Sequence, residues 1–209
     1  MSSFEIWWAI FALAIVVLAG FAGKWANGSA VGILIDSRGR VSLTHVQIVA
    51  WTVLILSAFL AALVASCFDA KQAGLSEDLL GLMGIAAGSA VLATGVKAAK
   101  DAKEEKDPVV KVARADATRT VVAPDGTATK VKFGTKFSQI WLEEEGEFAD
   151  RVINATKFQN FLFTLAAIAM FVALAIKAHG LPPELPKHFL ALLGISHAGY
   201  VGGKIPDKK

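Results

Sequence analysis

The chain has few charged residues, and it has only one cysteine. Cys67 cannot form a disulfide within the chain, which excludes a small secreted domain held together by disulfides. Only 39 of the 209 residues are charged, and 23 of these lie between residues 97 and 157. With a mean hydropathy of +0.54, this distribution excludes an ordinary soluble enzyme and a disordered tail, and it is typical of a chain in a lipid bilayer. The net charge of +3 is too small to indicate binding to nucleic acid.

Uncharged apolar runs predict five transmembrane helices in an all-α integral membrane protein. Four runs have close to the 20 or so residues that a helix needs to cross the hydrocarbon core. They are residues 6–23, 46–68, 79–96 and 158–176. The fifth run, residues 189–203, is short and contains His197, so its length alone also fits a re-entrant or interfacial segment.

A sequence duplication favours a spanning role for the fifth run. Residues 44–52 read THVQIVAWT and residues 156–164 read TKFQNFLFT, so a glutamine and two threonines recur at the same spacing. The next helices align as well, because LLGLMGIA at residues 79–86 resembles FLALLGIS at residues 189–196. We therefore predict one N-terminal helix followed by two parallel repeats of a helical hairpin.

The basic residues indicate which side of the membrane each loop occupies. Eighteen Lys and Arg residues lie in the loops and tail on one side, and three lie on the other. Because basic residues concentrate on the cytoplasmic side, the N-terminus is predicted outside and the C-terminus in the cytoplasm. The membrane is predicted to be the inner membrane of a bacterium. The predicted organisation is a helix at 1–23, a cytoplasmic loop at 24–45, a first hairpin at 46–96, a cytoplasmic insert at 97–157, a second hairpin at 158–204 and a tail at 205–209.

The cytoplasmic insert has three predicted parts. The third helix continues past the bilayer through a run of good helix formers that ends before Pro108. Residues 118–123 and 127–133 flank a Pro-Asp-Gly turn and predict a small β-hairpin. Residues 137–142 predict an interfacial segment anchored by Ile140 and Trp141.

The predicted spans contain no Asp, Glu, Lys or Arg, which argues against pumps, voltage sensors and proton-coupled transporters. The sequence completes no catalytic or metal-binding motif, so we expect no enzyme, no metal and no cofactor. Neutral polar residues and His197 remain as candidates to line a hydrated path or to join helices. They are Gln47, Thr52, Gln159, Asn160, Thr164 and His197. Small residues spaced to allow close helix packing form a second set: Gly84, Gly88, Gly194, Ala198 and Gly202.

The spacing within each repeat constrains how the polar residues can face. Each threonine follows its glutamine by five residues, which is about 500° around a helix, so the two lie roughly 140° apart. A glutamine that faced lipid would leave its amide unsatisfied at a cost of several kcal/mol. We therefore expect Gln47 and Gln159 to face protein or water, and Thr52 and Thr164 to lie on another face.

Two classes of function remain compatible with the sequence. The first is a homo-oligomeric channel or pore lined by neutral polar residues, since five helices are few for a complete transporter. The second is a non-conducting membrane scaffold or anchor whose cytoplasmic insert docks a partner. The expected partners are the lipid bilayer, further copies of the chain and a cytoplasmic protein.

Overall fold

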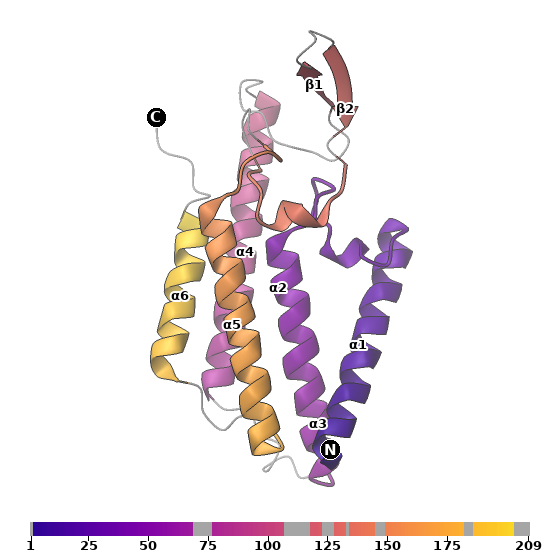
Figure 1. Ribbon diagram of the computed structural model, residues 1–209, viewed down its shortest axis with the longest axis vertical. Coiled ribbons are helices and arrows are strands. Elements are labelled where there is room, and N and C mark those ends of the chain that lie inside the picture. The colour runs from indigo at the N-terminus through magenta and orange to yellow at the C-terminus, as the bar shows by residue number, and fades with distance from the viewer. Residues whose placement is uncertain are drawn as a thin grey trace.

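The computed structural model describes residues 2–68, 77–106, 118–122, 128–132, 134–144, 149–181 and 186–202. Most of these residues belong to helices that run nearly parallel to the long axis of the molecule (Figure 1). The chain runs in one direction along α1, α4 and α6, and in the opposite direction along α2–α3 and α5 (Figure 1). The described part of the chain is therefore an up-and-down bundle.

Local sequence signals explain where the first helices begin and end. Helix α1 (Ser3–Asn27) begins after Ser2, whose hydroxyl accepts a hydrogen bond from the Glu5 N–H, and it ends at Gly28, which has a φ of 70°. The second rod has three parts, namely α2 (Leu43–Trp51), the π-helix η2 (Thr52–Leu56) and α3 (Ser57–Ala65). Ser57 at the end of the π-helix donates its hydroxyl to backbone carbonyls one turn earlier, an interaction that locally perturbs helices.

The remaining elements complete the bundle and the insert. Their bounds are α4 (Glu77–Lys106), α5 (Ala155–Ala178), α6 (Lys187–Gly202), β1 (Thr118–Val122), β2 (Ala128–Lys132), and the 3₁₀ helices η1 (Gly32–Leu34) and η3 (Phe137–Ile140). Helix α4 packs against α2 and α6, and α6 also packs against α5. Strands β1 and β2 pair antiparallel, with Thr118 opposite Lys132, and the predicted turn at 124–126 lies outside the described residues.

Four helical rods are long and apolar enough to cross a membrane: Ser3–Asn27, Leu43–Ala65, Glu77–Ala102 and Ala155–Ala178. At most 28% of the apolar window of each rod is buried, and in α1 Leu18, Phe21 and Trp25 are 66%, 71% and 86% exposed. These features are compatible with a multi-pass protein and suggest membrane localisation. Helix α6 has only 16 residues, so the fifth span stays a prediction.

The bundle has a main apolar core and a smaller second one. Phe171 lies at the centre of the main core, where Trp8 and Trp51 pack edge-on against its ring at centroid distances of 6.2 and 6.4 Å. The second core includes Leu43, Ile140 and Tyr200. Ile140, predicted to anchor an interfacial segment, is instead fully buried, because η3 folds back over this core and leaves Phe137 exposed.

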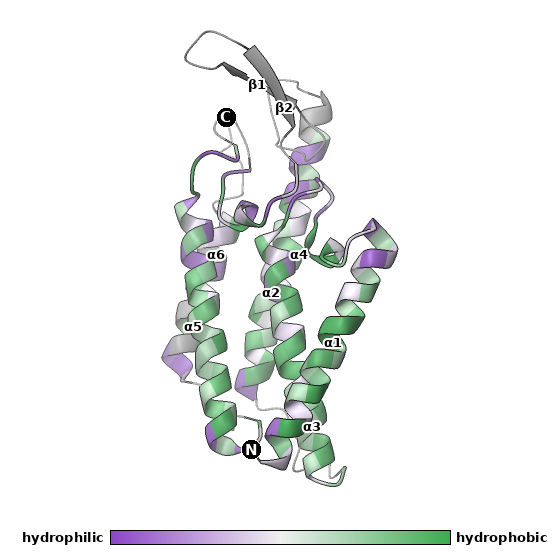
Figure 2. Cartoon of the chain, turned by 45° about the vertical axis from the view of Figure 1, so that its right-hand side comes forward, coloured by the Kyte–Doolittle hydropathy of each residue, from purple (hydrophilic) through white to green (hydrophobic). Residues whose placement is uncertain are grey.

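We call the end of the bundle at which α2 and α5 begin the insert end. It contains residues 32–42, 97–101 and 134–144, and α4 continues beyond the other helices here (Figure 1). Hydrophilic residues gather at this end, whereas the rods below it are largely hydrophobic (Figure 2). The insert end is therefore where the chain brings charge and polarity together.

Candidate functional site

Three of the predicted polar residues meet between α2 and α5. The Nε2 atom of Gln47 donates to Asn160 Oδ1 at 3.3 Å and to Thr164 Oγ1 at 2.6 Å. The Thr164 hydroxyl donates in turn to the Asn160 carbonyl oxygen at 2.8 Å. All three residues are buried, with exposures of 4% or less. Their hydrogen bonds join two helices, which is how polar side chains hold membrane helices together.

In each rod the glutamine and the threonine lie on different faces, but the residue that is buried differs between the two rods. In the first, Gln47 is buried and Thr52 is exposed, whereas in α5 Gln159 is exposed and Thr164 is buried. Asn160, the residue after Gln159, takes the inward place instead. Gln47 packs against protein, as one half of the expectation has it, whereas the exposed Gln159 contacts no other described helix in this way, and its facing protein of another copy or water stays a prediction. The structure thus does not support the predicted repeat at these positions.

His197 joins α6 to α4 inside the bundle. Its Nδ1 atom lies 2.7 Å from the hydroxyl oxygen of Ser89, and the residue is only 4% exposed. This arrangement is that of a histidine that packs one helix against another.

The predicted small residues do not bring helices of this chain together. A Cβ atom added at Gly84, Gly88 or Gly202 would meet no atom within 4 Å among the described residues, and Ala198 is exposed. Only Gly194 approaches a neighbour, since its added Cβ would lie 3.9 Å from Ile85 Cδ1. Among the described residues these positions therefore make little contact within the chain, and their role in helix packing, including packing between copies of the chain, stays a prediction.

An ionic network at the insert end converges on Glu144. The Oε1 atom of Glu144 lies 2.5 Å from Lys157 Nζ and 3.5 Å from Lys97 Nζ, and its Oε2 atom lies 3.4 Å from Arg38 Nη1. Arg38 also pairs with Asp101 at 3.1 Å. The Arg38 side chain is fully buried, and that of Glu144 is only 10% exposed. Buried charges of this kind persist only when they are paired.

The turn between residues 35 and 41 supplies the other half of the network. Asp36 accepts hydrogen bonds from the backbone N–H groups of Arg38 and Arg40 at 3.0 and 3.1 Å, and Gly39 has a φ of 71°, which an L side chain rarely adopts. The second Asp36 oxygen lies 2.7 Å from Lys97 Nζ. Arg40 pairs with Asp150 at 2.7 Å. This turn therefore reaches both α4 and the segment that precedes α5.

The Asp36 carboxyl is held in its charged form. Its burial would raise the pKa, but the Lys97 ammonium and the Arg40 N–H outweigh burial and place the pKa below its ordinary value. We call the eight residues that make these contacts the ionic network: Asp36, Arg38, Arg40, Lys97, Asp101, Glu144, Asp150 and Lys157.

No protein family, curated protein or solved structure matches the chain. The geometry of the polar groups is therefore the basis for inferring function. Among the described residues, no group of three or more His, Cys, Asp or Glu side chains is placed to hold a metal ion.

Of the sequence features, Lys97 and Lys157 give the best indication of the ionic network. Each stands where an apolar run meets the insert, and acidic residues lie within a few positions or one short loop of each. From the sequence, the two lysines indicate only where spans end and which side of the membrane the insert occupies. Their partners depend on the three-dimensional arrangement, so the pairing could not be assigned from spacing.

A pocket of about 430 Å³ opens beside the ionic network, between the start of α2, the turn at 36–42 and α4. Most of its lining surface is apolar, although many of the lining residues carry polar or charged groups: Asp36, Ser37, Ser42, Thr44, His45, Ala93, Thr94, Lys97, Ala98 and Asp101. This size is within the range of small-molecule sites, about 300–1,000 Å³.

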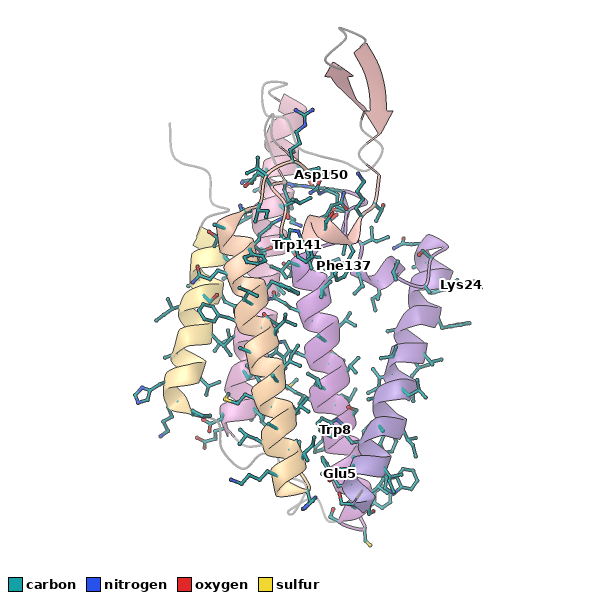
Figure 3. The ribbon with its side chains drawn as sticks, in the orientation of Figure 1. Glu5, Trp8, Lys24, Phe137, Trp141 and Asp150 are labelled. Atoms are coloured by element: carbon teal, nitrogen blue, oxygen red, sulfur yellow. The ribbon has the colours of Figure 1, made fainter. Side chains whose placement is uncertain are left out.

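The opposite end of the bundle is simpler. Glu5 and Trp8 lie there, far from Phe137, Trp141 and Asp150 at the insert end (Figure 3). Glu5 Oε1 lies 3.1 Å from Nδ1 of His179, which connects α1 to the end of α5. A shallow groove of about 300 Å³ beside these residues is lined almost entirely by apolar side chains. Concentrated polar chemistry is thus a feature of the insert end.

Proposed function

We propose that this protein is a non-conducting multi-pass membrane scaffold whose bundle holds the cytoplasmic insert in a fixed place for a partner protein. The observation that carries the proposal is that both ends of the insert are ion-paired to the same turn. Lys97 and Asp101 at its beginning contact Asp36 and Arg38, and Glu144 near its end contacts Arg38. An insert tied at both ends is positioned by the bundle, as a docking platform requires.

The alternative of a channel has less support. Gln47, Asn160 and Thr164 bond to one another, and His197 bonds to Ser89, so these groups are directed away from a path for water. A pore between copies of the chain would have to use the exposed residues Thr52 and Gln159 instead. These two lie on different rods and carry no charge to attract an ion.

The proposed membrane arrangement has five spans, with the insert end in the cytoplasm and the N-terminus outside. Helix α6 packs along α4 and α5 and runs parallel to the rods, which supports its being a short fifth span (Figure 1). The concentration of buried Arg and Lys at the insert end agrees with cytoplasmic placement in a bacterial inner membrane.

The proposed duplication has support from backbone structure rather than from the glutamines. A 3₁₀ helix, an isolated antiparallel bridge and a capping residue precede α2, in the order η1, Ile35 with Val41, and Ser42. The same succession precedes α5, in the order η3, Leu142 with Ile153, and Asn154. A scaffold of this kind would also assemble with further copies through the open face of α4 around Gly84 and Gly88.

Site-specific photo-cross-linking in native membranes tests the docking proposal. A photoreactive residue at position 130 in strand β2 should give a discrete protein adduct, whereas the same residue at His179 at the opposite end of the bundle should not. Glu144→Gln should weaken the adduct at position 130, because it releases one end of the insert. Equal adducts at both positions, or an adduct at position 130 that Glu144→Gln leaves unchanged, would contradict the proposal.

A further inference from the structure

The start of α2 lines the pocket, and no side chain caps its first N–H groups in the described part of the chain. The first N–H groups of a helix have no partner within the helix, and they carry the positive end of its dipole. The capping residue Ser42 is 2% exposed and lines the pocket, yet its side chain makes no capping hydrogen bond in the part of the chain that the structure describes. At the start of α5, by comparison, the side chain of Asn154 caps the helix, because its Oδ1 atom accepts a hydrogen bond from the Lys157 N–H at 2.9 Å.

His45 adds a second unsatisfied group to the same pocket. Its Nδ1 atom is buried and has no hydrogen-bond partner among the described residues. Lys97 brings an ammonium group to the same lining, on α4 across from the start of α2. Helix N–H groups, a hydroxyl and a cation are the donors that bind phosphate groups in proteins.

The pocket also contains acceptors for a positive group. Asp36 and Asp101 both line it, and the Asp101 carboxylate, which pairs with Arg38, is 23% exposed. In the described network the cations Arg38, Arg40, Lys97 and Lys157 face the acids Asp36, Asp101, Glu144 and Asp150. Of these, Asp36, Asp101 and Lys97 line the pocket, so the described lining has two acids and one cation, and a ligand that brings a positive group suits it better than an anion.

The position of the pocket along α4 indicates where such a ligand comes from. Ala93, Thr94, Lys97, Ala98 and Asp101 line one face of α4, at the point where its long uncharged stretch gives way to charged residues. This is the level at which the apolar part of a spanning helix meets the lipid headgroups. Ser37, Thr94 and Ala98 are exposed, so the pocket is open on this side.

We propose that this pocket binds the headgroup of phosphatidylethanolamine from the adjacent leaflet. The phosphate lies at the start of α2, near Ser42 and Lys97, and the ammonium group donates hydrogen bonds to Asp101. A choline headgroup carries no N–H to donate, and a glycerol headgroup leaves the lipid with a net negative charge. The inference rests on membrane placement of the bundle and is independent of whether the protein is a scaffold or a channel.

Native mass spectrometry of the full chain in detergent can test this proposal with lipids of matched acyl chains. We expect phosphatidylethanolamine to bind roughly tenfold more tightly than phosphatidylcholine or phosphatidylglycerol, from the hydrogen bonds to a charged acceptor. Ala98→Phe should abolish this preference, because it fills the pocket from an exposed position. Ala99→Phe is the matched control, since Ala99 is also exposed on α4 but does not line the pocket.

Ser37→Phe gives a second block from the opposite wall, and thermal unfolding checks that each variant remains folded. Loss of the preference in Ala98→Phe and Ser37→Phe, with retention in Ala99→Phe, supports the proposal. Equal binding of phosphatidylglycerol would overturn it, as would a preference that survives both blocks. Displacement of the lipid by inorganic phosphate at the concentration at which soluble glycerophosphoethanolamine displaces it would also overturn it, because the pocket would then select phosphate and not the ethanolamine headgroup.

Discussion

Glu144 is the residue on which three of the buried cations converge. Its carboxylate contacts Lys157, Lys97 and Arg38, which belong to α5, α4 and the turn before α2. Removing one member of a buried ion network is costly, because it leaves opposite charges without compensation. A single carboxylate thus joins three segments that are far apart in the chain.

Glu144→Gln should lower the free energy of unfolding by about 3 kcal/mol, the usual cost of breaking a buried ion pair. Glu77→Gln, at an exposed position at the start of α4, should change it by less than about 0.5 kcal/mol. Denaturant unfolding of both variants in the same detergent measures the difference. If the two substitutions have equal effects, the network does not stabilise the fold.

Asp36 makes the stability of the insert end depend on pH. Its pKa in the folded chain lies below the ordinary value, so the unfolded chain takes up the proton more readily. The stability that Asp36 contributes is therefore fully present above the ordinary aspartate pKa of about 4 and is lost as the pH falls further. Unfolding of the wild type and Asp36→Asn as a function of pH should show a constant gap near neutrality that narrows below about pH 4. If the difference in the free energy of unfolding widens on acidification, the pKa of Asp36 is raised in the folded chain and not lowered.

At the scale of elements, α2 and α5 are held together by one buried hydrogen-bond cluster. Gln47 donates two hydrogen bonds across to α5, one to Asn160 and one to Thr164. Its sequence counterpart Gln159 lies on the outer surface of α5, at an exposed position. The two glutamines therefore form a natural pair of test and control positions.

Gln47→Leu should reduce stability by about 1–2 kcal/mol, because it leaves the buried groups of Asn160 and Thr164 without their partner. Gln159→Leu should be neutral or slightly stabilising in a membrane, since it replaces an exposed amide by an apolar side chain. Unfolding measurements on both variants, reconstituted in the same lipid, test the contrast. If both substitutions lower the free energy of unfolding equally, Gln159 makes a stabilising contact that this structure does not show.

The four long spans could be predicted from the sequence because, in a chain of this composition, an uncharged apolar run of about 20 residues is typical of a membrane-spanning helix. The helices α2 and α5 begin three residues before the predicted spans, at Leu43 and Ala155, directly after the N-cap positions Ser42 and Asn154. The outward position of Gln159 could not be predicted, because its neighbour Asn160 competes for the same inward place. The ionic network could not be predicted either, because its pairs join residues as far apart as Arg38 and Glu144.

At the scale of the whole molecule, the bundle has two unlike ends. One has an exposed ion pair between Glu5 and His179, and the other has the buried ionic network and the insert. Basic side chains buried at the insert end agree with the distribution of Lys and Arg along the chain. The two ends should therefore lie on opposite sides of the membrane.

Cysteine labelling in intact cells tests this sidedness. In a Cys67→Ala background, cysteines placed at Ala73 and Leu185 should react with an impermeant thiol reagent from outside, because both positions belong to short sequence segments with few basic residues between predicted spans. Lys130→Cys should react only after the membrane is permeabilised. Reaction of Lys130→Cys from outside, with the other two positions silent, would invert the proposed orientation.

The most direct test of the scaffold proposal is ionic conductance of the purified full-length protein in liposomes. Gln47 bonds to Asn160 and Thr164, and His197 bonds to Ser89, so we predict no conductance above that of empty liposomes under varied voltage, tension and ionic conditions. Gln47→Leu should leave this result unchanged. A reproducible wild-type conductance that Gln47→Leu reduces, in a variant that still assembles, would contradict the scaffold and establish a conducting path.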